Sequence, residues 1–389
     1  MRRGITLVVI TLLMVLSARD VAPQNVPFEP SGWNREGAAN YLDERMDVWF
    51  ATTKKLQTGQ GQTRCVSCHT VIPYALARPA LRQAMQVRTP TSQEVRLIEE
   101  VTRRTETYDA HQPYYDFDDA KKVESRGTEA VLNALILAGA DAEQQRREPS
   151  EPTRRAFRRL LETQRADGAW DWLDFGLEPF ESADAAYYGA TLAALAISAA
   201  PAFAASQAAE ATAHINKLRG YLTERYGAKS LFNRVWLLLA ATGWKDLLTK
   251  VQRDALIAEV QRAQQDDGGW SLRALGGWRW SKAAGRFQPP GTLDAALLAK
   301  SDGYATGLIV YALRKAGLPG ENPAVRRGVH WLKANQQGVQ VGERIHPAWR
   351  AHSLNHDREH GGKTGEPWRR LFMSDAATAF AVLALLASE

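Results

Sequence analysis

Hydrophobic positions follow a helical period over most of this chain. Segments such as 191–200 and 306–316 are apolar on nearly every side, which indicates buried helices. Segments such as 153–162 and 254–264 carry charge on one face and predict helices half exposed to solvent. The two kinds alternate, and no segment shows the period of a strand. The pattern predicts an all-α fold of about twelve helices, paired as hairpins in a two-layered ring. The expected helices begin near residues 36, 72, 91, 127, 151, 183, 208, 230, 249, 302, 322 and 374.

A short motif recurs at the ends of the half-exposed helices. It reads QRADGAW at 164–170 and QQDDGGW at 264–270, and a degenerate third copy, WLKANQQG at 331–338, lacks the tryptophan. A second helix follows each copy and begins at a Ser or Ala that precedes Asp. The side-chain oxygens of Ser and Asp are suited to cap a helix. Repetition of this kind indicates one supersecondary unit that is stacked several times. These openings lie at 182–185, 301–304 and 374–377.

The motif Q-x-x-D-G-x-W, followed by Ser-Asp and an Ala/Leu-rich helix, resembles the repeat of the squalene–hopene cyclase, oxidosqualene cyclase and prenyltransferase superfamily. The resemblance covers roughly residues 125–389, with two clear copies. It implies an (α/α)6 toroid in which Gln164, Trp170, Gln264 and Trp270 join helix ends. Function does not follow from the fold, so other residues must indicate it.

A candidate acid of the cyclase type lies at Asp116-Phe117-Asp118-Asp119. This string matches the Asp-x-Asp-Asp set of the cyclisation enzymes, whose central carboxyl, here Asp118, protonates the substrate when burial keeps it protonated. The Thr-Ala that usually follows in the family is missing, because Ala120-Lys121-Lys122 stands there. The alternative is a solvated acidic loop or a helix N-cap. The chain is also shorter than the two-domain hopene cyclases, and a prenyltransferase zinc site would need a cysteine.

Both cysteines of the chain lie in one motif, Cys65-Val66-Ser67-Cys68-His69. C-x-x-C-H is the attachment signature of c-type haem. Thiols three positions apart reach two vinyl groups of one porphyrin, and the histidine that follows supplies an axial imidazole. We expect one covalent haem c, with His69 as the proximal iron ligand. A reversible or structural disulfide is the alternative, whereas a zinc site would need two further ligands at metal spacing.

The N-terminus indicates export. Arg2 and Arg3 precede an apolar run over 5–16, and small residues follow at 17–18. This order is typical of a secretory signal, and the run is too short for a membrane span. We expect a signal peptide at 1–22, a single domain over 23–389, a periplasmic location and no stable membrane span after cleavage. An uncleaved N-terminal anchor is the alternative. Export agrees with the motif, because haem c is attached outside the bacterial inner membrane.

The haem motif falls at a helix-entry loop of the repeat. When Tyr74-Ala75-Leu76-Ala77 is laid over Tyr311-Ala312-Leu313-Arg314, Cys65 stands opposite Asp302 and His69 opposite Thr306. Upstream, residues 55–61 resemble the Gln/Gly loop of the other copies. We therefore expect the haem-attachment loop near residues 57–70. Entry loops of a toroid open on one end, and we expect the haem at that mouth.

The last entry loop carries a long insertion, at 338–373, which a closed ring brings beside the first hairpin. It holds four histidines, three of which recur every four residues and would share one face of a helix. We expect the distal iron ligand among Met373, His346, His352, His356 and His360; Met46, Met85 and His111 are further candidates. The alternatives are an exposed polar loop and a second metal bound by the three periodic histidines.

A second insertion, at 266–300, overhangs the same mouth. It contains Trp270, Trp278 and Trp280 together with Arg273, Arg279 and Arg286. Guanidinium groups suit haem propionates, so these arginines are candidate propionate contacts. Packing of the loop itself and a docking surface are the alternatives.

The formal charge of the chain is +6, from 49 Lys and Arg against 43 Asp and Glu. This weak basic excess is spread over predicted helix surfaces and is no nucleic-acid footprint. We expect either a redox partner protein or a small-molecule substrate, and an apolar, terpenoid-like ligand is a further candidate.

These features together predict an exported mono-haem, cytochrome-like protein that transfers electrons or acts as a haem-dependent oxidoreductase. Two alternatives stay open. One is a terpene cyclase-like enzyme with Asp118 as its acid. The other is a toroid that binds an apolar ligand or partner without catalysis, while the haem is structural.

Overall fold

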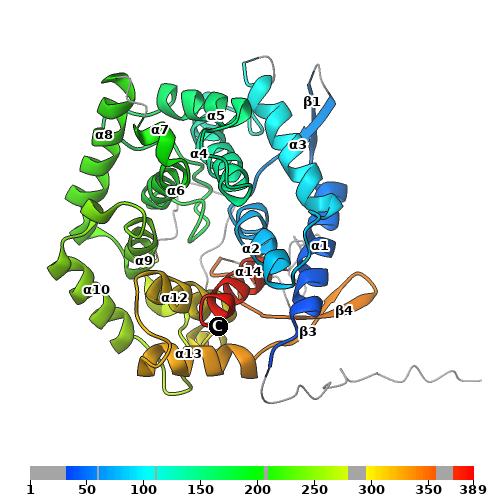
Figure 1. The fold of residues 1–389 in the computed structure, drawn as a ribbon, viewed down its shortest axis with the longest axis vertical. Helices are drawn as coiled ribbons and strands as arrows, with labels where there is room; N and C mark the ends of the chain where they lie inside the picture. The colour runs from blue at the N-terminus through cyan, green and yellow to red at the C-terminus, as the bar shows by residue number, and fades with distance from the viewer. Residues whose placement is uncertain (1–31, 59–60, 110–111, 206–208, 279–294, 356–370) are drawn as a thin grey trace, which may run out of the picture.

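Helices make up the framework of the protein. The computed structural model describes residues 32–58, 61–109, 112–205, 209–278, 295–355 and 371–389. The helices form two concentric layers around a common centre (Figure 1). The inner layer consists of α2 (Val71–Ala84), α4 (Asp119–Glu143), α6 (Ala185–Ala199), α9 (Leu231–Ala240), α12 (Gly303–Lys315) and α14 (Phe372–Leu386). The outer layer consists of α1 (Arg35–Thr52), α3 (Ser92–Glu106), α5 (Glu151–Glu162), α8 (Ala209–Arg225), α10 (Lys250–Arg262) and α13 (Pro323–Ala334).

The inner layer is closed, because each inner helix packs on the next and α14 packs on α2. Helices α6 and α14 consist mainly of small and apolar residues and are buried along most of their length. Outer helices bury one side only, as α5 does with Thr153, Ala156, Phe157 and Leu160. The prediction of a mainly helical fold, in which buried and half-exposed helices alternate, is confirmed.

Most helices begin within a few residues of the predicted positions. Helix α4 is the exception: it begins at Asp119 rather than near residue 127, because the side chain of Asp118 accepts a hydrogen bond from the backbone N–H of Lys121 and caps it. Short elements were not predicted. They are α7 (Pro201–Ala205), α11 (Ala295–Ala299) and the 3₁₀ turns η1 (Tyr226–Ala228), η2 (Lys245–Leu247) and η3 (Leu272–Leu275).

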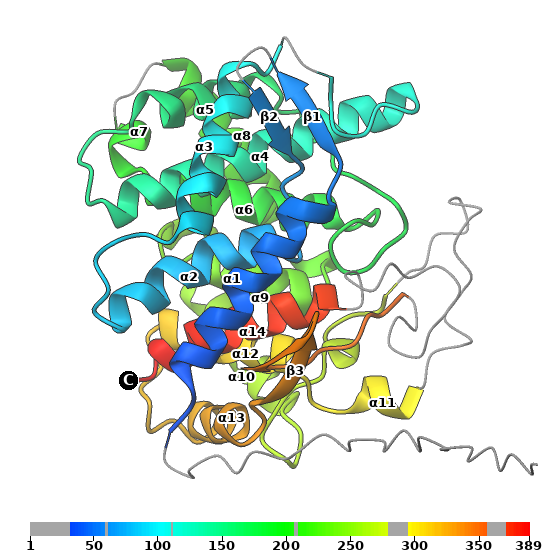
Figure 2. The same cartoon turned by 90° about the vertical axis from the view of Figure 1, so that its right-hand side faces the viewer.

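The prediction that the chain contains no strand is wrong. Strands β1 (Lys55–Thr58) and β2 (Gly61–Arg64) form one antiparallel pair, and β3 (Gln337–Val341) and β4 (Arg344–Ala348) form another. Gln57, which we expected in a Gln/Gly loop, therefore lies in a strand, and the insertion after residue 338 starts as a hairpin. Strands of four or five residues are too short to show a period in the sequence. In Figure 2 the described parts of the two insertions, α11 and β3, lie at the same end of the ring.

The two clear copies of the repeat motif join helix ends in the same way. Gln164 donates to the carbonyl of Gly168, 2.9 Å away, and to that of His214 in α8. Gln264 donates to the carbonyl of Gly268, 2.7 Å away, and to that of Ala324 in α13. Each glutamine thus links the end of one outer helix to the start of the next. The structural role expected for these residues agrees with this geometry.

The tryptophan and glycine of each copy complete the connection. Trp170 Nε1 donates to the carbonyl of Leu160, and Trp270 Nε1 to that of Val260, both at 2.8 Å. Each indole therefore satisfies a carbonyl at the end of its own outer helix. The glycines, with φ of +93° at Gly168 and +91° at Gly268, take the left-handed backbone that the turn requires.

The third copy closes the ring. Gln336 donates to the carbonyl of Asn34 at 2.9 Å and accepts from the backbone N–H of Asn34 at 2.7 Å. Asn34 caps α1, so the last outer helix is joined to the first. No tryptophan closely follows Gly338 in the sequence, but the structure supplies one from farther along the chain. Trp349, placed beyond the β3–β4 hairpin, donates to the carbonyl of Leu332 at 2.7 Å, as Trp170 and Trp270 do in their copies.

The predicted signal peptide and its cleavage site, at 1–22, lie outside the described residues. Within the part of the chain that the structure describes, no helix combines the length and the apolar character needed to cross a membrane.

Replacement of Gln336 by Ala tests ring closure. We expect the free energy of unfolding to fall by about 2 kcal/mol, because both hydrogen bonds to Asn34 are lost and their partners stay half-buried. Denaturant unfolding followed by circular dichroism measures the change. Gln340→Ala is the matched control, since Gln340 is exposed on β3. Equal unfolding midpoints for the two variants would show that closure does not depend on this glutamine.

Candidate functional site

The motif at 65–69 lies between β2 and α2, at the entry of an inner helix. Cys65 and Cys68 are free thiols, 9% and 2% exposed, and form no disulfide with each other. Ser67 Oγ accepts hydrogen bonds from the backbone N–H groups of Thr70 and Val71, at 3.3 and 3.2 Å. Ser67 therefore caps α2, although Thr70 occupies the N-cap position and makes no capping bond of its own.

Burial keeps both thiols protonated. It raises the pKa of Cys65 and Cys68 well above the ordinary value, and the charge of Glu181 adds to the effect at Cys68. A reactive dithiol needs the opposite shift, since the thiolate is the nucleophile. The redox-dithiol alternative is therefore disfavoured at these two cysteines.

The imidazole of His69 lies between aromatic rings. Phe372, at the start of α14, stacks on it with ring centroids 3.8 Å apart and planes 18° apart. Trp49 of α1 meets it edge to face at 5.7 Å, and Trp49 Nε1 donates to the carbonyl of Cys65. These contacts hold the face of the imidazole, while a metal bond would form along its edge, in the ring plane.

Hydrogen bonds tie His69 to a buried carboxylate. His69 Nδ1 lies 2.9 Å from Thr70 Oγ1, and Thr70 Oγ1 lies 2.7 Å from Asp375 Oδ2. Asp375 also accepts from Arg45 Nε at 2.6 Å, Arg45 Nη2 at 3.0 Å and Tyr41 Oη at 2.9 Å. The network therefore joins α1, α14 and the entry of α2.

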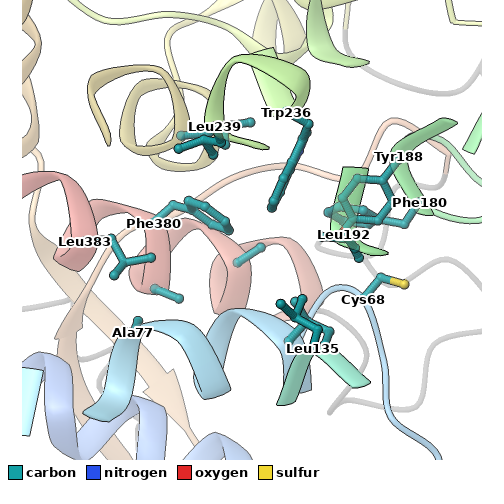
Figure 3. Packing of buried hydrophobic residues seen from close by; sticks show 14 of the residues in the cluster. Cys68, Ala77, Leu135, Phe180, Tyr188, Leu192, Trp236, Leu239, Phe380 and Leu383 are labelled. Carbon is teal, nitrogen blue, oxygen red and sulfur yellow. The ribbon is translucent and has the colours of Figure 1, made fainter. Parts of the chain in front are cut away.

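Cys68 faces the centre of the ring. Figure 3 shows Cys68 at the edge of the buried cluster that contains Phe180 and Tyr188, and Cys68 lies close enough to Tyr188 to affect the pKa of its hydroxyl. Tyr188 meets Trp236 at 4.9 Å between ring centroids, and Phe180 meets Tyr304 at 5.7 Å. This aromatic cluster is buried and belongs to the same hydrophobic core as Cys68.

The candidate distal ligands are dispersed. Met373 is buried in the first turn of α14, beside the Phe372 that stacks on His69. His346 in β4 is bound to Glu44, with Nε2 and Oε2 2.6 Å apart, and His352 is half-buried and close enough to Asp302 to affect its pKa. His356, His360 and His111 lie outside the described residues.

Two further methionine candidates lie on α1 and at the end of α2. Met46 is fully buried in α1, and Met85 follows the last residue of α2. A helix of that length places Met85 about 20 Å from the end where His69 lies, so Met85 was a wrong candidate. Among the described residues, no group of three or more His, Cys, Asp or Glu is arranged to hold a metal ion.

Of the three arginines proposed as propionate contacts, the structure describes Arg273. Arg273 is exposed in η3, and its carbonyl accepts a hydrogen bond from Trp278 Nε1 at 3.1 Å. Arg279, Arg286 and Trp280 lie outside the described residues.

The Asp-x-Asp-Asp string does not form a buried acid. Asp116, Asp118 and Asp119 are exposed, and the side chain of Asp119 is 98% exposed and paired with Lys122. Asp118 caps α4, and Phe117 is also exposed. A cyclase acid must be shielded from water to stay protonated, so the cyclase prediction is wrong and the N-cap alternative describes Asp118.

Asp302 is a buried carboxyl at the entry of α12. It accepts hydrogen bonds from the backbone N–H groups of Tyr304, Ala305 and Leu272, as the predicted cap does. Burial raises its pKa to about 6, although those three donors lower it. By contrast, Asp184 and Asp375 make no capping bond at α6 and α14, so the caps predicted there are wrong.

Thr70, Asp375, Arg45 and Phe372 were not predicted to belong to this site. They come from segments up to about 300 residues apart, joined only when the ring closes. The sole signal in the sequence was Ser374-Asp375, which matches the helix openings of the repeat and was interpreted as a cap.

No protein-family model and no curated protein sequence matches the chain. Two solved structures are similar in the course of their helices. One is the unsaturated glucuronyl hydrolase responsible for the degradation of glycosaminoglycan from Bacillus sp. GL1, with 13% identity, a TM-score of 0.49, and coverage of 90% of this chain and 95% of the other. The second is a complex of UGL with dGlcA-Glc-Rha-Glc, with 12% identity, a TM-score of 0.48, and coverage of 90% and 94%.

The prediction of a cytochrome-like protein that works in electron transfer or as an oxidoreductase is corrected here. Neither of the two similar solved structures is described as a cytochrome: one is an unsaturated glucuronyl hydrolase and the other a UGL complex. The motif at 65–69 led to that prediction, but a short motif describes a local site and not the scaffold that carries it.

Stability should depend on the protonation of Asp302. Its folded-state pKa of about 6 lies above the ordinary 3.8, so the protonated form favours the folded state. We expect the free energy of unfolding to fall by about 2 kcal/mol as the pH rises from about 4 to about 6, out of about 3 kcal/mol for the whole titration. Denaturant titrations across that range measure it. Asp302→Asn keeps a capping oxygen and does not titrate, so it should lack this loss; parallel pH profiles for the two proteins would contradict the assignment.

Proposed function

We propose that Cys65, Cys68 and His69 form a site for one covalently attached haem at the entry of α2. The proposal concerns the cofactor and does not include electron transfer. The observation that carries it is the arrangement of the motif: two unpaired thiols and an imidazole on one short loop, with the imidazole ring held on its face and bonded at Nδ1.

The surroundings fit a flat apolar group. Cys68 belongs to the same buried core as the aromatic cluster, and the pKa of each thiol is raised, which favours thiols that stay neutral over those that react as thiolates. Phe372 stacks on the face of His69, and Trp49 meets the same imidazole at a steep angle, so both rings fix its orientation. The hydrogen bond at Nδ1 is the partner that metal-bound histidines usually have.

When bound, the haem would supply an iron whose properties depend on its axial ligands and the polarity around it. The chain's own residues have separate tasks. Ser67 fixes the start of α2, Cys65 and Cys68 anchor the group, and Phe372 shields His69 from solvent. Met373 is retained as the distal candidate because it adjoins Phe372.

We also propose that the helical ring is an (α/α)6 toroid of the terpenoid cyclase and prenyltransferase type. The Gln–Gly–Trp connections at 164–170 and 264–270, and their counterpart at Gln336 and Trp349, support this proposal. Export to the periplasm, directed by residues 1–22, belongs to the same proposal, since haem c is attached there.

Expression of the full chain with a haem c maturation system tests the site. We expect one haem per chain that survives acid–acetone extraction and gives a c-type pyridine haemochrome spectrum. Cys65→Ala and Cys68→Ala should each remove one thioether, and the double variant should lose all covalent haem. His330→Gln, on the exposed side of α13, is the control for His69→Gln and should keep its haem. A wild-type chain recovered without covalent haem, from cells that load a reference cytochrome, would refute the proposal.

A second candidate function is hydrolysis of an oligosaccharide, with Asp302 as the general acid. The observation that favours it is a buried carboxyl whose pKa of about 6 suits proton donation near neutral pH, next to Tyr304 of the aromatic cluster.

An assay with an unsaturated glucuronyl oligosaccharide, the substrate class of the UGL structure, tests this candidate. We expect Asp302→Asn to lower kcat by at least about 100-fold. Asp184→Asn is the control, since Asp184 opens α6 without a capping bond. No turnover by the wild type would remove this candidate and leave the haem site untouched.

A further inference from the structure

We propose that Thr70 and Asp375 are positioning residues that hold the imidazole of His69 in the tautomer with its proton on Nδ1. The purpose of this arrangement rests on the proposed function, because that tautomer leaves the lone pair on Nε2, the nitrogen that a metal would bind.

The direction of the hydrogen bonds follows from Asp375. Its two oxygens receive donors from Arg45 Nε, Arg45 Nη2 and Tyr41 Oη, all within 3.0 Å. A carboxylate that is ion-paired with a guanidinium carries no proton and only accepts hydrogen bonds. The contact between Thr70 Oγ1 and Asp375 Oδ2, at 2.7 Å, therefore has the threonine as its donor.

The tautomer of His69 then follows by elimination. A hydroxyl has one proton, and Thr70 uses it on Asp375. The contact of 2.9 Å between Thr70 Oγ1 and His69 Nδ1 can only have Nδ1–H as its donor. The neutral imidazole must therefore carry its lone pair on Nε2.

An independent observation supports a dedicated role for Thr70. A threonine at an N-cap ordinarily turns its hydroxyl to the helix, but Thr70 makes no capping bond and Ser67 caps α2 instead. Asp375 likewise does not cap α14, although helix openings of the same kind do so elsewhere, as at Asp302. Both side chains are buried, and both take part in the same chain of hydrogen bonds, which includes His69.

Nitrogen NMR of the full chain tests the inference. The chain is labelled with ¹⁵N-histidine, produced without haem and studied about two pH units above the ordinary histidine pKa, where an unperturbed imidazole is neutral. Long-range ¹H–¹⁵N spectra distinguish protonated from non-protonated ring nitrogens, and His69→Gln assigns the resonance. The variants are Thr70→Val, which removes the hydroxyl at constant shape, and Thr70→Ser, which restores it. Circular dichroism checks that each variant is folded.

We expect the wild type and Thr70→Ser to show a protonated Nδ1 and a non-protonated Nε2 at His69. Thr70→Val should shift the population toward the tautomer protonated on Nε2. His214, whose Nδ1 lies 2.6 Å from Gln164 Oε1, is an internal control and should not change. A wild type protonated on Nε2, or a Thr70→Val spectrum equal to that of the wild type, would overturn the inference.

The two proposals fail separately. The NMR result concerns the chain without haem and stands whatever the haemochrome test shows. A covalent haem on a chain whose His69 is protonated on Nε2 would overturn the positioning role alone.

Discussion

Closure of the helical ring is the constraint on which the rest of the structure depends. Inner helices such as α14 are apolar on nearly every side and can be buried only if each has a neighbour on both sides. The last inner helix must therefore pack on the first, and α14 does pack on α2. Gln336 and Asn34 join the outer layer at the same seam, and Asp375 joins α14 to α1 through Arg45 and Tyr41. The candidate cofactor site lies at this seam.

An ion pair at the seam has an energetic cost that its neighbours offset. Arg45 and Asp375 are 3% and 1% exposed, so both charges lose nearly all of their hydration. The carboxylate of Asp375 accepts hydrogen bonds from Arg45, Tyr41 and Thr70. These bonds compensate for much of the hydration that the two charges lose. If α1 shifted against α14, Arg45 and Asp375 would separate and each would be a buried, unpaired charge. The ion pair therefore favours one arrangement of the two helices. That arrangement also orients His69, because Asp375 binds Thr70 and Thr70 binds the imidazole.

The two halves of the ring use different connections. In the later hairpins the Gln–Gly–Trp motif joins successive outer helices through backbone carbonyls. In the first hairpins buried ion pairs connect neighbouring helices instead, between Arg104 and Glu129 and between Arg78 and Asp43. A bond to a backbone carbonyl depends on the one side chain that donates it, whereas a buried ion pair depends on two side chains. The half that holds the haem motif is therefore the half with the stricter side-chain requirements.

By itself, the sequence determined the helices, their alternation in burial and the repeat, because these depend on patterns within about 20 neighbouring residues. The Cys65–His69 motif was recognisable for the same reason. The hairpins at 55–64 and 337–348 were missed since their strands are too short to show a period. Only the tertiary structure decided that Trp349 completes the third repeat, that Asp118 is exposed and that Thr70 and Asp375 bind His69. The physical reason is that closure of the ring joins residues about 300 positions apart. The sequence around a polar side chain does not indicate which distant residue will be its hydrogen-bond partner.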